Sequence, residues 1–257
     1  MSPITKLVLI IEYEGTNYYG FQWQKDQPTI QAELEKAIWK LTGERRRVIS
    51  ASRTDTGVHA KGQVVSFRTE SGLRTDSFVK GLNFHLPVDI AVKAAYRASA
   101  SFNVRREAVS REYSYSIINR PTRLAIERSS AYLVSGKLDI DLMNEAARAL
   151  IGKQDFVSFV TSLEPNIKTT EREVYKAEFR RDGNQVTFTV LANSVLPHQV
   201  RNTVGALIRV GTGKMTVEGF KKVIEAKRPG LGKPTAPAHG LCLMRVNYPS
   251  PLEEMCN

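Results

Sequence analysis

The stretch Ser52-Arg53-Thr54-Asp55-Thr56-Gly57-Val58-His59-Ala60 brings a basic residue, a carboxylate, a turn glycine and a histidine together in one short segment. It lies between two runs that we expect to be strands, residues 47–51 and 63–67. Functional side chains are often carried by a loop that rises from a rigid sheet. This segment is therefore the first candidate for a functional site.

The tripeptide Asp55-Thr56-Gly57 can be interpreted as an ordinary turn or as the loop of an aspartic protease. As an ordinary turn, it would use the Asp side chain to bind backbone groups and the glycine to supply a positive φ. As an aspartic protease loop, it would need two carboxylates sharing one proton in an apolar setting. Here the tripeptide occurs once and follows the polar pair Arg53-Thr54. The protease interpretation is therefore disfavoured, and the turn interpretation stays open.

The charge balance of the 257-residue chain is strongly basic. Its 37 Lys and Arg residues exceed its 26 Asp and Glu residues, which gives a formal net charge of +11. Such an excess favours a polyanionic partner, most simply a nucleic acid. The alternative is a basic surface that is merely solvated. Hydrophobic residues make up 42% of the chain, enough for one large core or two smaller ones.

Cysteine and histidine are too sparse to indicate a metal centre or a disulfide framework. The two cysteines, Cys242 and Cys256, form neither a disulfide framework nor a metal-binding motif. The four histidines are scattered and lack the spacing of metal ligands. The segment Gly211-Thr212-Gly213-Lys214 lacks the upstream glycine of a phosphate-binding loop. We therefore expect no metal and no cofactor. The start of the chain has no signal-peptide profile and no apolar run is long enough for a membrane span, which favours a cytoplasmic protein.

Side-chain periodicity predicts the order strand, helix, strand, strand, helix, strand in the first part of the chain. The expected segments are 7–13, 30–41 capped by Thr29 and ended by Gly43, 47–51, 63–67, 76–82 and 90–96. An aromatic-rich loop, residues 18–24, follows the first strand. Its rings can stack on bases, although aromatic residues next to a strand more often pack into the core.

The second part of the chain repeats the same order with one extra helix. The expected segments are 109–119, a helix through 146–150, 173–180, 185–191 after an Asp182-Gly183 hairpin turn, a helix from Pro197 to Gly211, a helix capped by Thr216, and 241–248. We expect an α+β fold of two ferredoxin-like βαββαβ halves, residues 1–105 and 106–257. The halves would join into a larger antiparallel-rich mixed sheet, with helices on one face and a cleft between the halves.

Five segments, in order along nearly the whole chain, resemble one family, the tRNA pseudouridine synthases of the A (TruA) type. They are the aromatic loop 18–24, the Ser52 segment continued by Gly62-Gln63-Val64-Val65, the strand 110–119, the helix start 196–205 and the closing segment 236–243. The family pattern has glycine where this chain has Ser52 and alanine where it has Thr56. Both differences are small, and they concern the geometry of the loop more than its chemistry.

The resemblance implies an isomerase that converts uridine to pseudouridine at positions 38 to 40 of the tRNA anticodon stem-loop. It also implies a homodimer that needs no cofactor or metal. Asp55 would be the catalytic carboxylate and Tyr113 would contact the target uracil. Arg201 would pair with Asp55, and Arg53 would help to hold the base out of the stack. Without the resemblance, strand alternation favours a core position for Tyr113, and Arg201 could be a phosphate contact or a solvated position.

Several basic residues are candidates for contacts to the tRNA backbone, although each alone could simply be solvated. They are Arg45, Arg46, Arg47, Arg105, Arg106, Lys221 and Lys222. Two other functions stay open: a non-catalytic RNA-binding protein on the same scaffold, and a pseudouridine synthase that acts on other RNA. A binding protein has no evident need for a carboxylate in a site for a polyanion.

Overall fold

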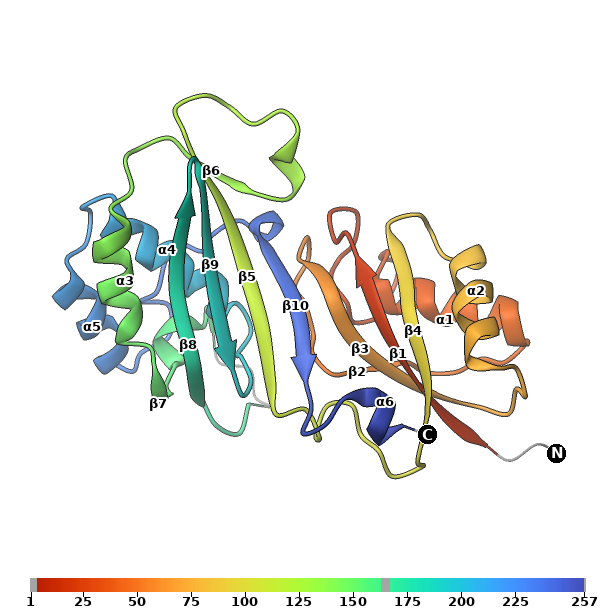
Figure 1. Ribbon diagram of the computed structural model, residues 1–257. Coiled ribbons are helices and arrows are strands. Elements are labelled where there is room, and N and C mark those ends of the chain that lie inside the picture. Colours follow the sequence, from red (N-terminus) through yellow and green to blue (C-terminus); the bar gives the residue numbers. More distant parts are fainter. Residues whose placement is uncertain (1–3, 163–166, 257) are drawn as a thin grey trace. The chain divides into compact units, whose positions relative to one another are not determined.

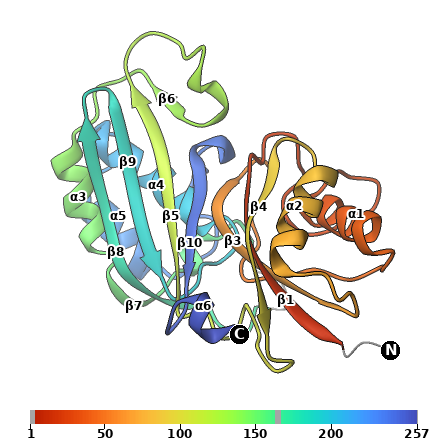
Figure 2. The ribbon, with the colours of Figure 1, turned by 45° about the vertical axis from the view of Figure 1, so that its right-hand side comes forward.

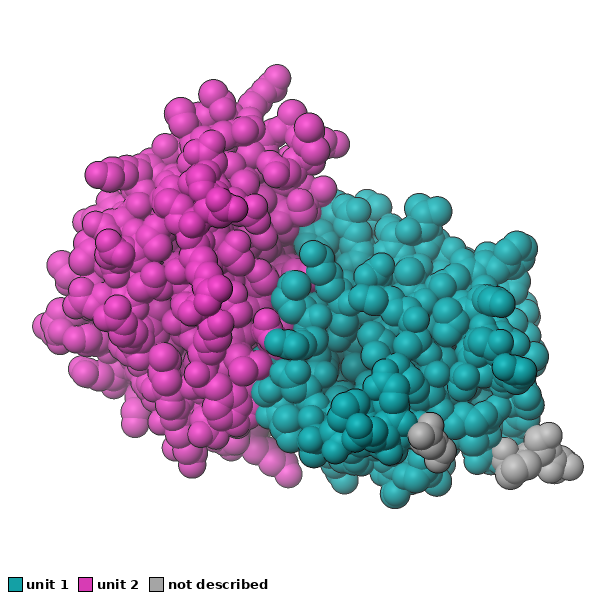
Figure 3. Space-filling view, in the orientation of Figure 1, with its two compact units in different colours: residues 1–111, 243–257 teal, residues 112–242 magenta. Residues whose placement is uncertain are grey.

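The structure, a computed structural model, describes residues 4–162 and 167–256. Contacts within the chain define two units, which are described separately here (Figure 3). One consists of residues 1–111 and 243–257, and the other of residues 112–242. The predicted boundary between residues 105 and 106 stays a prediction. The first unit passes into the second at residues 111 and 112, close to the predicted boundary. The first unit also includes residues 243–257, which the prediction assigned to the second half.

The first unit contains a sheet with the strand order β4-β1-β3-β10, and β2 also pairs with β3 (Figure 1). Its elements are β1 (Thr5–Tyr13), α1 (Ile30–Thr42), β2 (Ile49–Ser50), β3 (His59–Thr69), α2 (Thr75–His85), β4 (Ile90–Ala98), most of β10 (Leu241–Asn247) and α6 (Leu252–Met255). The pairs β1–β3, β1–β4 and β2–β3 are antiparallel. Helices α1 and α2 contact each other and lie on the same face of this sheet (Figure 2).

Helix α1 forms where local signals predict it. The Thr29 side chain accepts a hydrogen bond from the backbone N–H of Ala32 at 3.3 Å, as an N-cap residue does. At the other end, Gly43 has a φ of 75° and donates its backbone N–H to the carbonyl of Trp39 at 2.8 Å. The apolar face between the caps is buried, with Leu34 and Ile38 fully enclosed. This face fixes the helix against the sheet.

The strand predicted at residues 47–51 is shorter than expected. Ile49 and Ser50 are in register with β3, and the backbone N–H of Ala51 donates to the carbonyl of Val64 on β3 at 2.8 Å. The backbone N–H of Val48 instead donates to the carboxylate of Glu35 on α1, at 3.0 Å. Because a side chain from the helix takes this donor, the ladder begins at Ile49, two residues later than predicted.

The second unit has the strand order β5-β9-β8-β7, and the short strand β6 runs parallel to β5. Its elements are most of β5 (Ser110–Asn119), β6 (Tyr132–Val134), α3 (Ile140–Arg148), β7 (Gly152–Asp155), β8 (Glu171–Asp182), β9 (Gln185–Ala192), α4 (Gln199–Gly211) and α5 (Val217–Glu225). The pairs β7–β8 and β8–β9 are antiparallel. The chain is thus confirmed as α+β with mostly antiparallel pairing.

Two details of the second unit differ from the sequence-based expectation. Helix α4 begins at Gln199 rather than at Pro197, because His198 adopts a left-handed backbone with a φ of 60°. The turn of the β8–β9 hairpin is centred on Gly183 and Asn184, one residue later than predicted, because Asp182 still pairs with Gln185. Strands β6 and β7 were not predicted, since three or four residues are too few to show an alternating pattern.

Candidate active site

The Asp55 segment forms a tight turn between β2 and β3 in the first unit. The backbone N–H of Val58 donates to the carbonyl of Asp55 at 3.1 Å, and Gly57 has a φ of 77°. A positive φ at the third position is the mark of a type II turn. Thr54 is buried, whereas Asp55 is partly exposed and Arg53 is exposed. The predicted turn and the positive φ of its glycine are therefore confirmed, and the turn leaves the Asp55 residue partly exposed.

A buried polar network holds the start of this turn. The side chain of Gln63 on β3 donates to the carbonyl of Ser52 at 2.7 Å and accepts from the backbone N–H of Ser52 at 3.2 Å. The hydroxyls of Tyr13 and Thr54 lie 2.8 Å apart and share a hydrogen bond. Gln63 is fully buried and Tyr13 is 4% exposed. Side chains from β1 and β3 thus fix the two ends of the segment that leads to Asp55.

The aromatic loop between β1 and α1 packs directly against the turn. Phe21 donates its backbone N–H to the carbonyl of Thr54 at 3.1 Å, and Gly57 donates to the carbonyl of Tyr18 at 3.3 Å. Gly20 lies between these contacts with a φ of 83°. A Cβ atom on Gly20 would lie 2.7 Å from the carbonyl oxygen of Thr54. The loop can approach the turn this closely only because this position is glycine.

The aromatic side chains of this loop divide into two pairs. Tyr18 and Phe21 are buried, whereas Tyr19 and Trp23 are about half exposed. The hydroxyl of Tyr18 donates to the carboxylate of Asp89 at 2.5 Å. Burial, followed by this carboxylate, raises the pKa of Tyr18. Two rings therefore serve packing, and the other two remain accessible to a ligand.

Arg111 is a buried arginine that anchors the strand leading into the turn. Its guanidinium donates to the carbonyls of Ala51 at 3.1 Å, Arg105 at 2.9 Å and Ala108 at 3.1 Å. The sequence placed Arg111 on the same face as the strand's tyrosines but gave no sign of this role. Gln63 and Tyr13 were missed in the same way. Their only sequence signal is a polar group within or at the end of an apolar strand.

Replacing Gln63 with leucine is expected to lower the free energy of unfolding by about 1–3 kcal/mol, because both backbone groups of Ser52 would lose a buried partner. Urea denaturation measures this change. Gln185, an exposed glutamine at the start of β9, provides the matched control. Equal midpoints for Gln63→Leu and Gln185→Leu would show that the network does not stabilise the fold.

In the second unit, β5 carries the predicted tyrosines toward the core. Tyr113 is 3% exposed and Tyr115 is fully buried. The hydroxyl of Tyr115 donates to the carbonyl of Pro237 at 2.7 Å. A Cβ atom on Gly240 would lie 2.6 Å from the Tyr115 ring. The closing segment 236–243 is thereby packed on the tyrosine strand.

Arg201 joins the same cluster from the first turns of α4. Its Nε donates to the carbonyl of Ala236 at 2.9 Å, and its own carbonyl accepts from the N–H of Ala236 at 3.1 Å. One turn later, Gly205 lies against the carbonyl of Pro234 with no room for a Cβ atom. Burial raises the pKa of Tyr115, although the charge of Arg201 acts in the opposite direction. Three segments distant in sequence therefore meet within this unit.

The four predicted site residues are divided between the two units of the chain. Arg53 and Asp55 belong to the first unit, whereas Tyr113 and Arg201 belong to the second. Their side-chain roles toward a substrate stay predictions.

The basic residues proposed for RNA contacts differ in their surroundings. Arg46 pairs with Glu44 at 3.0 Å and with Glu70 at 2.9 Å. Arg47 lies 3.4 Å from the carboxylate of Glu35. Arg45, Arg105 and Arg106 are exposed. Because carboxylates already neutralise part of this charge, Arg46 and Arg47 are weaker candidates for phosphate contacts than the spacing alone suggested.

Over residues 4–162 and 167–256, no group of three or more His, Cys, Asp or Glu side chains is arranged to hold a metal ion. In the same ranges, no helix combines the length and the apolar character needed to cross a bilayer.

Comparison with known proteins identifies the family. Residues 9–105 and 146–249 match the profile of the family described as tRNA pseudouridine synthase. The "tRNA pseudouridine synthase A" of Francisella tularensis subsp. novicida is 41% identical over 242 residues, which cover 94% of this chain and 93% of the relative. The protein of the same name from Clostridium acetobutylicum is 40% identical over 240 residues, 93% of this chain and 98% of the relative. The chain belongs to the tRNA pseudouridine synthase family. Pseudouridine synthases are isomerases, and this chain is an enzyme of that class.

Proposed function

We propose that this enzyme isomerises uridine to pseudouridine at positions 38 to 40 of the tRNA anticodon stem-loop, and that it works as a homodimer in the cytoplasm. The observation that carries the proposal is Asp55, a partly exposed carboxylate held on a rigid turn in a chain of net charge +11. A polyanion-binding surface has no use for a fixed carboxylate unless the carboxylate takes part in chemistry. Family membership supplies the reaction.

The reaction is a balanced rearrangement. The bond between C1′ of the ribose and N1 of uracil breaks, the base turns, and C1′ bonds to C5. The proton on C5 is lost and N1 gains one, so nothing is oxidised and no group leaves the substrate. A carboxylate suffices as nucleophile or as base. We assign this role to Asp55.

The other side chains act on the substrate in this proposal. Tyr113 contacts the target uracil, Arg201 assists in substrate binding, and the exposed Arg53 helps to keep the base out of the helix. Extruding a base from a stem costs a few kcal/mol, and a guanidinium can offset part of this by binding phosphate or filling the vacated space. Arg45, Arg46, Arg47, Arg105 and Arg106 remain proposed contacts to the RNA backbone.

We also propose that the chain is built from two ferredoxin-like halves, 1–105 and 106–257. In the first half, the order β4-β1-β3 with β2 on β3 supports this arrangement. In the second half, β5, α3, β8, β9, α4 and β10 occur in the same order of element types, with β6, β7 and α5 inserted between them.

The decisive experiment is incubation with unmodified tRNA transcripts followed by chemical mapping of pseudouridine. Pseudouridine at positions 38 to 40 supports the proposal. Modification only in other RNA would point to a related synthase with a different substrate. Tight tRNA binding without any modification would favour the non-catalytic RNA-binding protein.

Affinity for tRNA is expected to fall at least tenfold between about 50 and 200 mM salt, because each phosphate contact releases condensed counterions. Filter binding or fluorescence anisotropy across this range measures the slope. A constant affinity would mean that the net charge of +11 is a solvated surface and not a binding face.

A further inference from the structure

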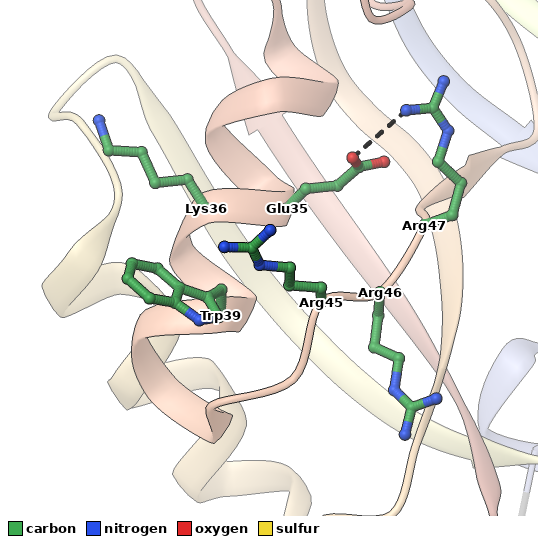
Figure 4. Close-up of a pocket in the computed structure, with 6 residues that line it drawn as sticks. All are labelled: Glu35, Lys36, Trp39, Arg45, Arg46 and Arg47. Atoms are coloured by element: carbon green, nitrogen blue, oxygen red, sulfur yellow. Dashed lines mark hydrogen bonds and ion pairs between the residues drawn. The ribbon is translucent and has the colours of Figure 1, made fainter.

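A pocket of about 420 Å³ opens on the surface of the first unit, between helix α1 and the segment that follows it (Figure 4). Most of its lining is basic, and its one aromatic ring is that of Trp39. The lining residues are Glu35, Lys36, Trp39, Arg45, Arg46 and Arg47. The pocket contains none of the residues assigned to catalysis.

Trp39 projects from the last turns of α1 with 48% of its surface exposed. The buried face of α1 is formed by other residues, among them Leu34 and Ile38. The indole is therefore not needed to close the core. A large, half-exposed ring among cations is a suitable platform for another flat group.

The cations around this ring are not equivalent. Arg46 forms ion pairs with Glu44 and Glu70, and Arg47 forms an ion pair with Glu35. Lys36 is only 3.7 Å from Glu33, and its side chain is 58% exposed.

Arg45 is the cation without an internal counter-ion. Within residues 4–162 and 167–256, its side chain makes no hydrogen bond or ion pair, and Figure 4 shows it folding back toward α1, on the side where Trp39 projects. A guanidinium in this position is available to an external anion.

We propose that this pocket binds one unpaired nucleotide of the RNA substrate, with the base stacked on Trp39 and its phosphate held by Arg45 and Lys36. Stacking on an aromatic side chain is worth about 1–3 kcal/mol per base and accepts any base. A base inside a stem has both faces covered and is not available to the indole. The inference rests on the proposed function for the identity of the RNA, but not for the binding chemistry.

Fluorescence of Trp39 provides a direct test. The chain has two tryptophans, so Trp23→Phe leaves Trp39 as the single reporter and keeps a ring beneath Arg47, which lies 5.7 Å above the Trp23 ring. In this background, a single-stranded uridine decamer is expected to quench the emission and to saturate. A fully paired RNA duplex of the same length should quench little.

Arg45→Ala, made in the same background, is expected to weaken decamer binding about tenfold, as loss of one charge-assisted contact predicts. The matched control is Arg74→Ala. Arg74 is an exposed arginine of the same unit that pairs with Asp76 at 3.3 Å and lies outside the pocket. Equal weakening by both substitutions, or equal quenching by duplex and decamer, would overturn the proposal in favour of general electrostatic attraction.

The effect on tRNA separates this inference from the catalytic one. Trp39→Ala should raise the Kd for tRNA about tenfold, Trp39→Phe should restore most of the affinity, and the single-turnover rate at saturating tRNA should not change. An unchanged Kd in Trp39→Ala would show that the pocket does not contact tRNA. The protein could show decamer quenching that depends on Arg45 and yet modify no tRNA. This outcome would support nucleotide binding in the pocket and refute the proposed function.

Discussion

Replacing Asp55 with asparagine should reduce pseudouridine formation by at least about 10⁴-fold, below detection in a single-turnover assay. The substitution keeps the size of the side chain but removes the charge needed for nucleophilic or basic catalysis. The turn itself should persist, because the hydrogen bond from Val58 goes to the backbone carbonyl of Asp55 and Gly57 keeps its positive φ.

Binding measurements distinguish lost chemistry from lost folding. The affinity of Asp55→Asn for tRNA should stay the same or rise, because a negative charge near phosphates is removed. Asp182→Asn makes the same isosteric change at an exposed position in the hairpin of the second unit and should retain full activity. Pseudouridine formation by Asp55→Asn at a rate near that of the wild type would remove Asp55 from the mechanism.

Replacing Gly20 with alanine should slow the reaction by about 10- to 100-fold, although Gly20 carries no reactive group. The added Cβ would lie 2.7 Å from the carbonyl oxygen of Thr54 and 3.2 Å from the carbonyl carbon of Asp55. The backbone of the turn would have to move to relieve this contact. A displacement of about 1 Å at a reacting group can lower the rate about 10²-fold.

The positive φ of Gly20 adds a separate effect, which a control must remove. Gly213 has a φ of 73°, and an added Cβ there would meet no atom within 4 Å. Gly213→Ala therefore introduces the same backbone strain, about 1–2 kcal/mol, without a contact to the turn. We expect a loss of thermal stability in both variants, larger in Gly20→Ala because of the added backbone contact, and slower chemistry only in Gly20→Ala. Equal rates would show that the turn tolerates the added methyl group.

Local sequence signals were sufficient for most of the secondary structure. Thr29 and Gly43 cap the two ends of α1 as predicted, because capping depends on residues within one turn. Thr216 caps α5 for the same reason. Strand β5 buries Arg111, Tyr113, Tyr115 and Ile117 on one face, since alternation follows from the strand geometry. The start of α4 was wrong by two residues because the left-handed conformation of His198 leaves no mark in the residue type.

By itself, the sequence determined the longer helices and strands, their order and the turn that presents Asp55, because each depends on residues close together in the chain. Only the tertiary structure decided what holds that turn. Gln63, Tyr13 and Arg111 reach it from 11, 41 and 60 residues away. It likewise decided that Glu44, Glu70 and Glu35 neutralise Arg46 and Arg47 while Arg45 is left beside Trp39. Hydrogen bonds and ion pairs depend on distance in space, and residue spacing predicts such distances only within a turn or a strand pair.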